Sequence, residues 1–121
     1  MCSSDLPRDM IPAFLRKTTA IGKETRVRIR SFGHAGDGNL HIYVCRDELP
    51  EEAWQQKVRH VMAELYAAAK EMGGEVSGEH GIGHAKKAFL RESKGDMQMR
   101  LMAGIKAVFD PNGILNPGKI V

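Results

Sequence analysis

Two segments in which apolar and polar residues alternate lie on either side of a run with glycines at positions 33, 36 and 38. Val27 and Ile29 alternate with arginines before this run, and Leu40, Ile42 and Val44 alternate with other residues after it. A period of two is typical of strands with one buried face. Glycine gives the chain the freedom to reverse direction between them. The sequence therefore predicts an antiparallel hairpin with a long, functional loop.

Three helices are expected around this hairpin. Apolar residues at helical spacing predict a first helix from about residue 9, with Pro12 in its first turn and Gly22 at its end. Pro50 and two glutamates begin a second helix, whose apolar repeat stops at Gly73. A third helix begins at about Asp96. Its apolar face is formed by Met97, Leu101, Ile105, Val108 and Phe109.

A short strand at residues 75–77 completes the expected elements, which occur in the order helix, strand, strand, helix, strand, helix. This order predicts the α+β class, a small antiparallel sheet with helices packed on one face. We expect 121 residues to form a single domain, 1–121. The other face of the sheet needs a cover, for which we expect further protein or a homodimer through the uncovered sheet face.

Composition excludes several classes of function. The net charge is +3 and the basic residues are scattered, so nucleic acid is not an expected partner. No apolar run approaches the roughly 18 residues of a transmembrane helix, and the N-terminus lacks the layout of a signal peptide. The two cysteines have no CxxC spacing. We expect a cytoplasmic chain with no transmembrane segment.

Histidines among glycines mark the candidate site. His34 and His41 belong to the first glycine run, and Glu79 and His80 to a second run at residues 77–83. Seven residues of continuous strand would separate His34 from His41 by about 23 Å, so only a chain that doubles back can bring them together. Two imidazoles and a carboxylate are typical ligands of a catalytic divalent metal. Histidine and aspartate in such loops also stabilise tight turns, and both interpretations stay open from spacing alone.

Three motifs in order resemble one family. They are GHAGDGNLH at 33–41, SGEHGIG at 77–83 and FDPNGILNPGK at 109–119. Together they resemble the C-terminal part of FAD-linked oxidases, the vanillyl-alcohol-oxidase-type flavoproteins that include D-lactate dehydrogenase, the glycolate oxidase flavin subunit and D-2-hydroxyglutarate dehydrogenase. The resemblance implies that residues 1–121 are a C-terminal fragment with a partial ferredoxin-like cap domain. The FAD-binding domain and the earlier half of the cap, with its basic substrate-binding residues, are absent from it.

The resemblance also implies roles for individual residues. His34, His41 and Glu79 match the ligands of a divalent metal such as zinc, manganese or iron. His80 matches the catalytic residue that takes a proton from the substrate hydroxyl as hydride passes to FAD. Asn39 matches a cofactor-binding position near the flavin.

Two further positions complete this set. Asn116, in the Asn-Pro-Gly-Lys turn, matches a second position near the flavin and the domain junction. Tyr43 stands where the 2-hydroxyglutarate branch tends to have asparagine, which is a departure from that branch.

The implied function is that of an FAD-dependent dehydrogenase or oxidase that acts on a small 2-hydroxy acid such as D-lactate, glycolate or D-2-hydroxyglutarate. The FAD-binding domain of the same parent protein is the expected partner, and the isolated fragment is expected to be inactive. Membrane association would come only through partner subunits. The alternative is a stand-alone divalent-metal-binding or interaction module without redox activity.

Overall fold

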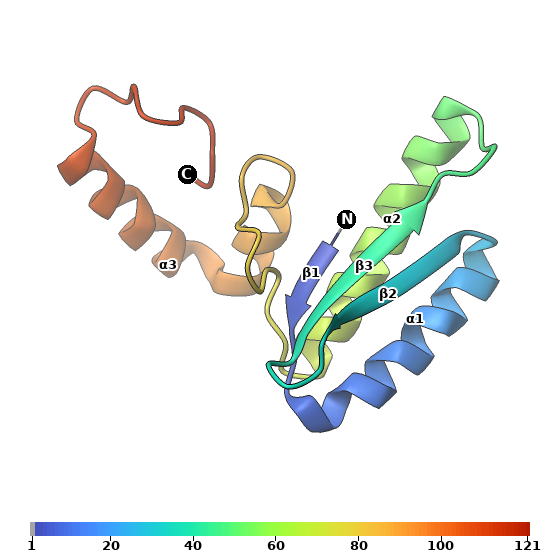
Figure 1. Ribbon diagram of the computed structural model, residues 1–121. Coiled ribbons are helices and arrows are strands. Elements are labelled where there is room, and N and C mark those ends of the chain that lie inside the picture. Colours follow the sequence, from blue (N-terminus) through green and yellow to red (C-terminus); the bar gives the residue numbers. More distant parts are fainter. Residues whose placement is uncertain (1) are drawn as a thin grey trace. The chain divides into compact units, whose positions relative to one another are not determined.

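The computed structural model describes residues 2–121 (Figure 1). Its contacts divide the chain into two compact units, Met1–His80 and Gly81–Val121. The single domain expected from length stays a prediction. The elements in chain order are β1 (Cys2–Asp5), a short 3-10 helix (Arg8–Met10), α1 (Ile11–Thr25), β2 (Arg28–His34), β3 (Asn39–Cys45), α2 (Glu51–Glu71) and α3 (Lys87–Phe109).

The first unit contains an antiparallel sheet with strand order β1-β3-β2. Strands β2 and β3 form the expected hairpin, and Ile29 pairs with Val44 within it. Strand β1 pairs with the other edge of β3, with Asp5 opposite Asn39. Strand β1 was not predicted, because residues 2–5 show no apolar alternation.

The core of this unit lies between the sheet and two helices. Leu40 and Ile42 point into it from β3, while α1 and α2 contact each other and supply most of the other buried side chains. Ile42 is fully buried, and burial of one such side chain contributes about 1.5–3 kcal/mol. The α+β class and the antiparallel sheet are confirmed.

Helix α1 does not end at Gly22 as predicted. It continues to Thr25, and Arg26 closes it in the left-handed region with φ 53°. The amide of Val27 then donates to the Gly22 carbonyl at 3.0 Å. A Cβ at position 22 would lie 3.1 Å from the Val27 carbonyl oxygen. Gly22 is therefore a position where the backbone of Val27 packs closely against the helix, and not the end of the helix.

Helix α2 confirms the second predicted helix. Its bounds, Glu51–Glu71, follow Pro50 directly and stop just before Gly73. Val61 and Leu65 are fully buried, and Trp54 is half-buried. After this helix the predicted strand at 75–77 is reduced to a single bridge, between Asp5 and Glu75.

The second unit consists mainly of α3 and the C-terminal segment that follows it. Helix α3 begins at Lys87, about nine residues before the predicted start. It is broken at Gly95, whose φ of 76° and ψ of 169° are not helical, so the predicted start at Asp96 matches the start of its second segment. The predicted apolar face of this segment is exposed.

No helix within residues 2–121 combines the length and the apolar character needed to cross a membrane. This agrees with the hydropathy of the sequence. The cytoplasmic location stays a prediction.

Candidate metal and proton-transfer site

The hairpin places His34 and His41 on the same face of the sheet. Strand pairing extends to His34 and Asn39, and the turn comprises only residues 35–38. The prediction of a long loop is therefore wrong. Phe32 lies opposite His41, and residues two apart on a strand share a face. His34 and His41 are therefore diagonal neighbours. Their ring centroids lie 6.2 Å apart.

Two glycines make this tight hairpin sterically feasible. A Cβ on Gly33 would lie 2.2 Å from the Asn39 carbonyl oxygen, so a side chain cannot fit without a shift of the backbone. Gly38 has φ 81°, and its carbonyl accepts a hydrogen bond of 2.9 Å from the amide of Leu6. Gly36 has open space around it. The first motif therefore uses its glycines at 33 and 38 for close approach and chain reversal.

The second motif brings Glu79 and His80 to this face. Glu79 Oε1 lies 2.9 Å from His41 Nε2 and 3.6 Å from His80 Nε2. The ring centroids of His41 and His80 are 5.0 Å apart, with an angle of 69° between the ring planes. One carboxylate thus lies beside two imidazoles from different parts of the chain.

His34, His41 and Glu79 form a cluster that could hold a metal ion. One ligand atom from each lies within 4.8 Å of the other two. Ligands of a tetrahedral metal with bonds of about 2.0–2.1 Å approach to about 3.3 Å, so the side chains would close slightly around an ion. Imidazole and carboxylate ligands suit zinc, manganese or iron. The residues present therefore fit a divalent ion.

Burial at His41 supports the same fit. His41 is 6% exposed, whereas the Glu79 side chain is 51% exposed. His41 Nδ1 has no hydrogen-bond partner within the described residues, and neither has the buried Asn39 Oδ1. Buried polar atoms without partners are uncommon and costly. Two such atoms beside three candidate metal ligands are typical of a site that receives a ligand.

The two asparagines expected near the flavin lie in different units. Asn39 lies in the first unit, 7% exposed, and Gly78 packs against it so closely that a Cβ there would be 2.7 Å from Asn39 Oδ1. The second motif therefore packs closely against Asn39 of the hairpin. Asn116 is exposed in the C-terminal segment of the second unit, with φ 45°. The flavin-contact roles of both stay predictions.

Phe32 is part of this face and was not among the predicted site residues. Its ring stacks on Tyr43 with centroids 5.1 Å apart and lies 5.3 Å from the His41 ring. Phe32 is 56% exposed and Tyr43 40% exposed. Cross-strand pairing of residue 32 with residue 41 was the signal that could have found it. Phe32 of β2 and Tyr43 of β3 thus form an exposed aromatic pair beside His41.

The arginines of β2 lie further along the same face. Arg28 forms a hydrogen-bonded ion pair with Asp47, and this partner raises the pKa of the guanidinium above its ordinary value. Both side chains are about half exposed, so the pair contributes little to stability. Arg30, two residues nearer to Phe32, is also exposed.

Comparison with known proteins adds independent information. The model of a family described as FAD linked oxidases, C-terminal domain, matches residues 4–120. A protein named D-lactate dehydrogenase from Anaerostipes hadrus is 52% identical over 119 residues, which are 98% of this chain and 25% of that protein. These matches extend across both units.

Two further relatives carry different names. D-2-hydroxyglutarate dehydrogenase from Stutzerimonas stutzeri is 39% identical over 113 residues, covering 91% of this chain and 24% of that protein. Glycolate oxidase subunit GlcD from Bacillus subtilis is 36% identical over 115 residues, covering 95% of this chain and 24% of that protein. The chain therefore spans about a quarter of the length of these relatives.

Proposed function

Because this chain belongs to the FAD-linked oxidase C-terminal domain family, we propose that it supplies the substrate and metal side of an FAD-dependent enzyme that oxidises a small 2-hydroxy acid. The observation that carries this proposal is the cluster of His34, His41 and Glu79 with His80 beside it. D-Lactate, glycolate and D-2-hydroxyglutarate are the substrates suggested by the names of the relatives. The FAD-binding domain of a parent protein is the proposed partner.

His34, His41 and Glu79 would hold a divalent ion and thereby fix the position at which the hydroxy acid binds. Such an ion, when bound, supplies a Lewis acid that makes a substrate hydroxyl more acidic and orients it. Glu79 lies beside both His41 and His80, so it connects this cluster to the residue proposed for proton transfer.

His80 is the proposed proton acceptor. Its side chain is 46% exposed, and its Nε2 lies 3.6 Å from Glu79 Oε1, so it is accessible and has a carboxylate beside it. Histidine suits this role because its ordinary pKa lies near neutrality. Oxidation of a 2-hydroxy acid to a 2-oxo acid releases one proton from the hydroxyl, which His80 accepts, and a hydride from C2. FAD, when bound, supplies the acceptor of that hydride.

The face around the cluster is suited to a small ligand that lies between this face and a second protein surface. Phe32 and Tyr43 present exposed aromatic rings, which would exclude water from a substrate once a second surface covers them. The alternative, a stand-alone metal-binding module, accounts for the cluster but not for the match of residues 4–120 to a flavoprotein domain.

The test is a hybrid protein in which this chain replaces the matched quarter of the Anaerostipes hadrus relative. The purified hybrid should carry flavin absorbance and reduce a dye acceptor with at least one of the three hydroxy acids. A hybrid that binds flavin stoichiometrically but oxidises none of them, with or without added zinc, manganese or iron, contradicts the proposal.

A further inference from the structure

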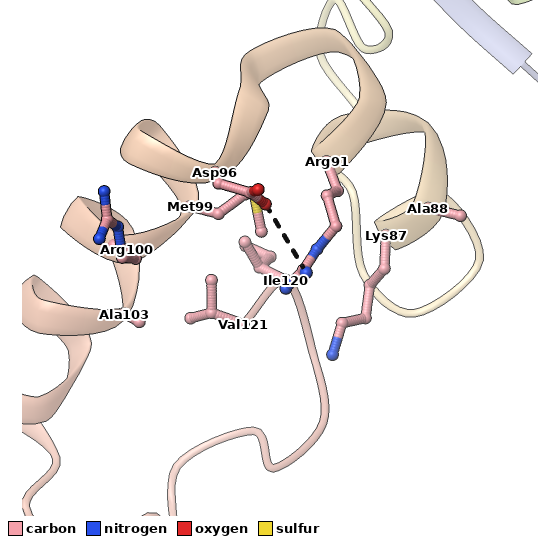
Figure 2. A pocket seen from close by; sticks show the side chains of 9 residues that line it. All are labelled: Lys87, Ala88, Arg91, Asp96, Met99, Arg100, Ala103, Ile120 and Val121. Atoms are coloured by element: carbon pink, nitrogen blue, oxygen red, sulfur yellow. Dashed lines mark ion pairs between the residues drawn. The ribbon is translucent and has the colours of Figure 1, made fainter.

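Three charged side chains around a cavity of the second unit bond within that unit. Figure 2 shows this cavity, of about 690 Å³, between α3 and the C-terminal segment. Arg91 lies 3.9 Å from Asp96, and Lys87 donates to the Gly118 carbonyl at 3.2 Å. Asn39 of the first unit is different, because it is 7% exposed and its Oδ1 has no hydrogen-bond partner within residues 2–121. A buried polar group of this kind indicates a role beyond folding.

The strand register puts Asn39 at the centre of the candidate site. It lies opposite His34 of β2 on one side and opposite Asp5 of β1 on the other. Asp5 also forms the bridge with Glu75, just before the second glycine-rich run. His41 follows two residues later on β3 and therefore shares the face of Asn39. One residue thus adjoins both hairpin histidines and the segment that carries the second motif.

Gly78 packs directly on the Asn39 carboxamide. For a Cβ built on Gly78, the three nearest heavy atoms would all belong to Asn39, with Oδ1 at 2.7 Å, Cγ at 3.0 Å and Nδ2 at 3.4 Å. A side chain at position 78 would therefore displace one of the two residues. The φ of Gly78 is not positive, so its backbone conformation does not itself require glycine. The close contact with Asn39 does.

This contact bears on Glu79, which follows Gly78 directly. The Glu79 side chain is 51% exposed, so burial holds it only in part, and its Oε1 reaches His41 Nε2 at 2.9 Å. Residues that bind a ligand work only when they are held within about 0.5 Å of the productive geometry. A shift of the backbone at Gly78 would move the carboxylate by at least that much. The position of Glu79 therefore depends on what lies beneath Gly78.

We propose that Asn39 is a positioning residue of the metal site. Its carboxamide supports the backbone at Gly78 and thereby sets the distance of the Glu79 carboxylate from the two hairpin imidazoles. This inference rests on the proposed function, since it concerns the same cluster. The role differs from the flavin contact that the family resemblance implies for Asn39, because it acts inside this chain and needs no flavin.

The first experiment measures the position of Glu79 without a metal. In the unmodified chain, nuclear Overhauser effects should connect the side-chain protons of Glu79 with the ring protons of His41, which is its close neighbour. Asn39→Ala and Gly78→Ala should each abolish these effects. Gly36→Ala is the matched control and should keep them, since its Cβ would meet nothing within 4 Å. Unchanged effects in Asn39→Ala and Gly78→Ala would overturn the inference.

The second experiment tests whether the two residues act through their contact. Gly78→Ala should lower the melting temperature of the chain, because the added methyl group meets the carboxamide. In the Asn39→Ala background the same change should cause no further lowering, since the methyl group then occupies the space that the carboxamide has left. Residues in contact show such non-additive effects. Equal lowering in both backgrounds, measured by circular dichroism, would show that the contact is not the link.

The third experiment separates positioning from folding by means of metal affinity. Asn39→Ala should weaken zinc binding by the chain about 10–100-fold, the usual cost of losing a residue that orients a metal ligand. In the Glu79→Ala background the same change should have little effect, because no carboxylate is left to position. Competition with a chelator measures both. A merely structural role of Asn39 would weaken binding equally in the two backgrounds, and this result would contradict the inference.

Flavin content and turnover are read separately, in the hybrid protein. The Asn39→Ala hybrid should retain normal flavin content. Loss of flavin, with the contacts between Glu79 and His41 intact, would assign Asn39 to the flavin and overturn the positioning role. A chain that passes the first two experiments but binds no metal, and whose hybrid oxidises no hydroxy acid, retains the support of Glu79 by Asn39 and loses the proposed function. A hybrid that turns over while Asn39→Ala leaves Glu79 in place has the opposite outcome.

Discussion

Glu79 Oε1 lies 2.9 Å from Nε2 of the buried His41. This contact joins two motifs that are almost forty residues apart in the sequence. Because His34 is the diagonal neighbour of His41 on the hairpin, one carboxylate and two imidazoles converge on a small volume. The same carboxylate oxygen also lies 3.6 Å from His80 Nε2.

We predict that the isolated chain binds a divalent ion through this cluster. His34→Ala and His41→Ala should each weaken binding of zinc, manganese or iron by at least about 10–100-fold, which is the cost of losing even an outer-shell partner. His60→Ala, an exposed histidine on α2, is the matched control and should bind like the unmodified chain. Elemental analysis after metal loading and desalting measures this. Stoichiometric metal in both site variants would place the ligands elsewhere.

For His80 we predict a loss of turnover without a loss of cofactor. In the hybrid protein, His80→Asn should lower kcat by about 10²–10⁴-fold, because the proton of the substrate hydroxyl loses its acceptor. Flavin content and metal content should not change, since His80 is neither a proposed ligand nor a core residue. Steady-state dye reduction as a function of pH measures the effect. Unchanged kcat in His80→Asn would remove His80 from the mechanism.

Two glycines of the first motif, one in β2 and one in the turn, provide a steric test of the site. Gly33→Ala should destabilise the first unit by about 1–3 kcal/mol, because its Cβ would be 2.2 Å from the Asn39 carbonyl oxygen. Gly36→Ala should be neutral or stabilising by about 0.4–1 kcal/mol, since its Cβ would meet nothing within 4 Å. Urea unfolding followed by fluorescence of Trp54, the single tryptophan, measures both. Equal midpoints for the two variants would contradict the tight packing at Gly33.

Local periodicity was sufficient to predict the elements that bury one face against their own unit. Alternation in residues 27–30 and 40–45 gave the hairpin, and the repeat from Trp54 to Met72 gave α2. Strand β1 was missed because its pairing with β3 is a backbone interaction that polar residues can make as well as apolar ones. Gly22 was mistaken for a helix end, because glycine is favoured both at helix ends and at positions where another part of the backbone packs closely.

The apolar positions of α3 show where periodicity is ambiguous. The pattern of Leu101 and Val108 correctly predicted a helix from about Asp96, but it does not say whether the apolar face packs on the same chain or on another. The candidate site shows a similar limit. Spacing left a metal site and a tight turn as equal interpretations, and only the strand register, which pairs Phe32 with His41, decides which histidine neighbours which.

A final prediction concerns acid and the C-terminal turn. Asp110 is 7% exposed. It accepts hydrogen bonds from Lys106 Nζ at 2.5 Å and from the amides of Ile114 and Leu115 at 2.9 and 3.0 Å. The Lys106 hydrogen bond, with help from the two amides, lowers the pKa of Asp110 below its ordinary value of 3.8 although burial opposes this.

A carboxyl group whose pKa is lower in the folded state stabilises the fold above its ordinary pKa, and this stabilisation is lost as pH falls through the folded value. We therefore expect the turn after α3 to hold at neutral pH and to open below about pH 4. Amide hydrogen exchange at Ile114 and Leu115 should show this loss of protection in the unmodified chain. Asp110→Asn should show faster exchange at neutral pH and no such step in acid. The same acid step in Asp110→Asn would assign it to another carboxylate.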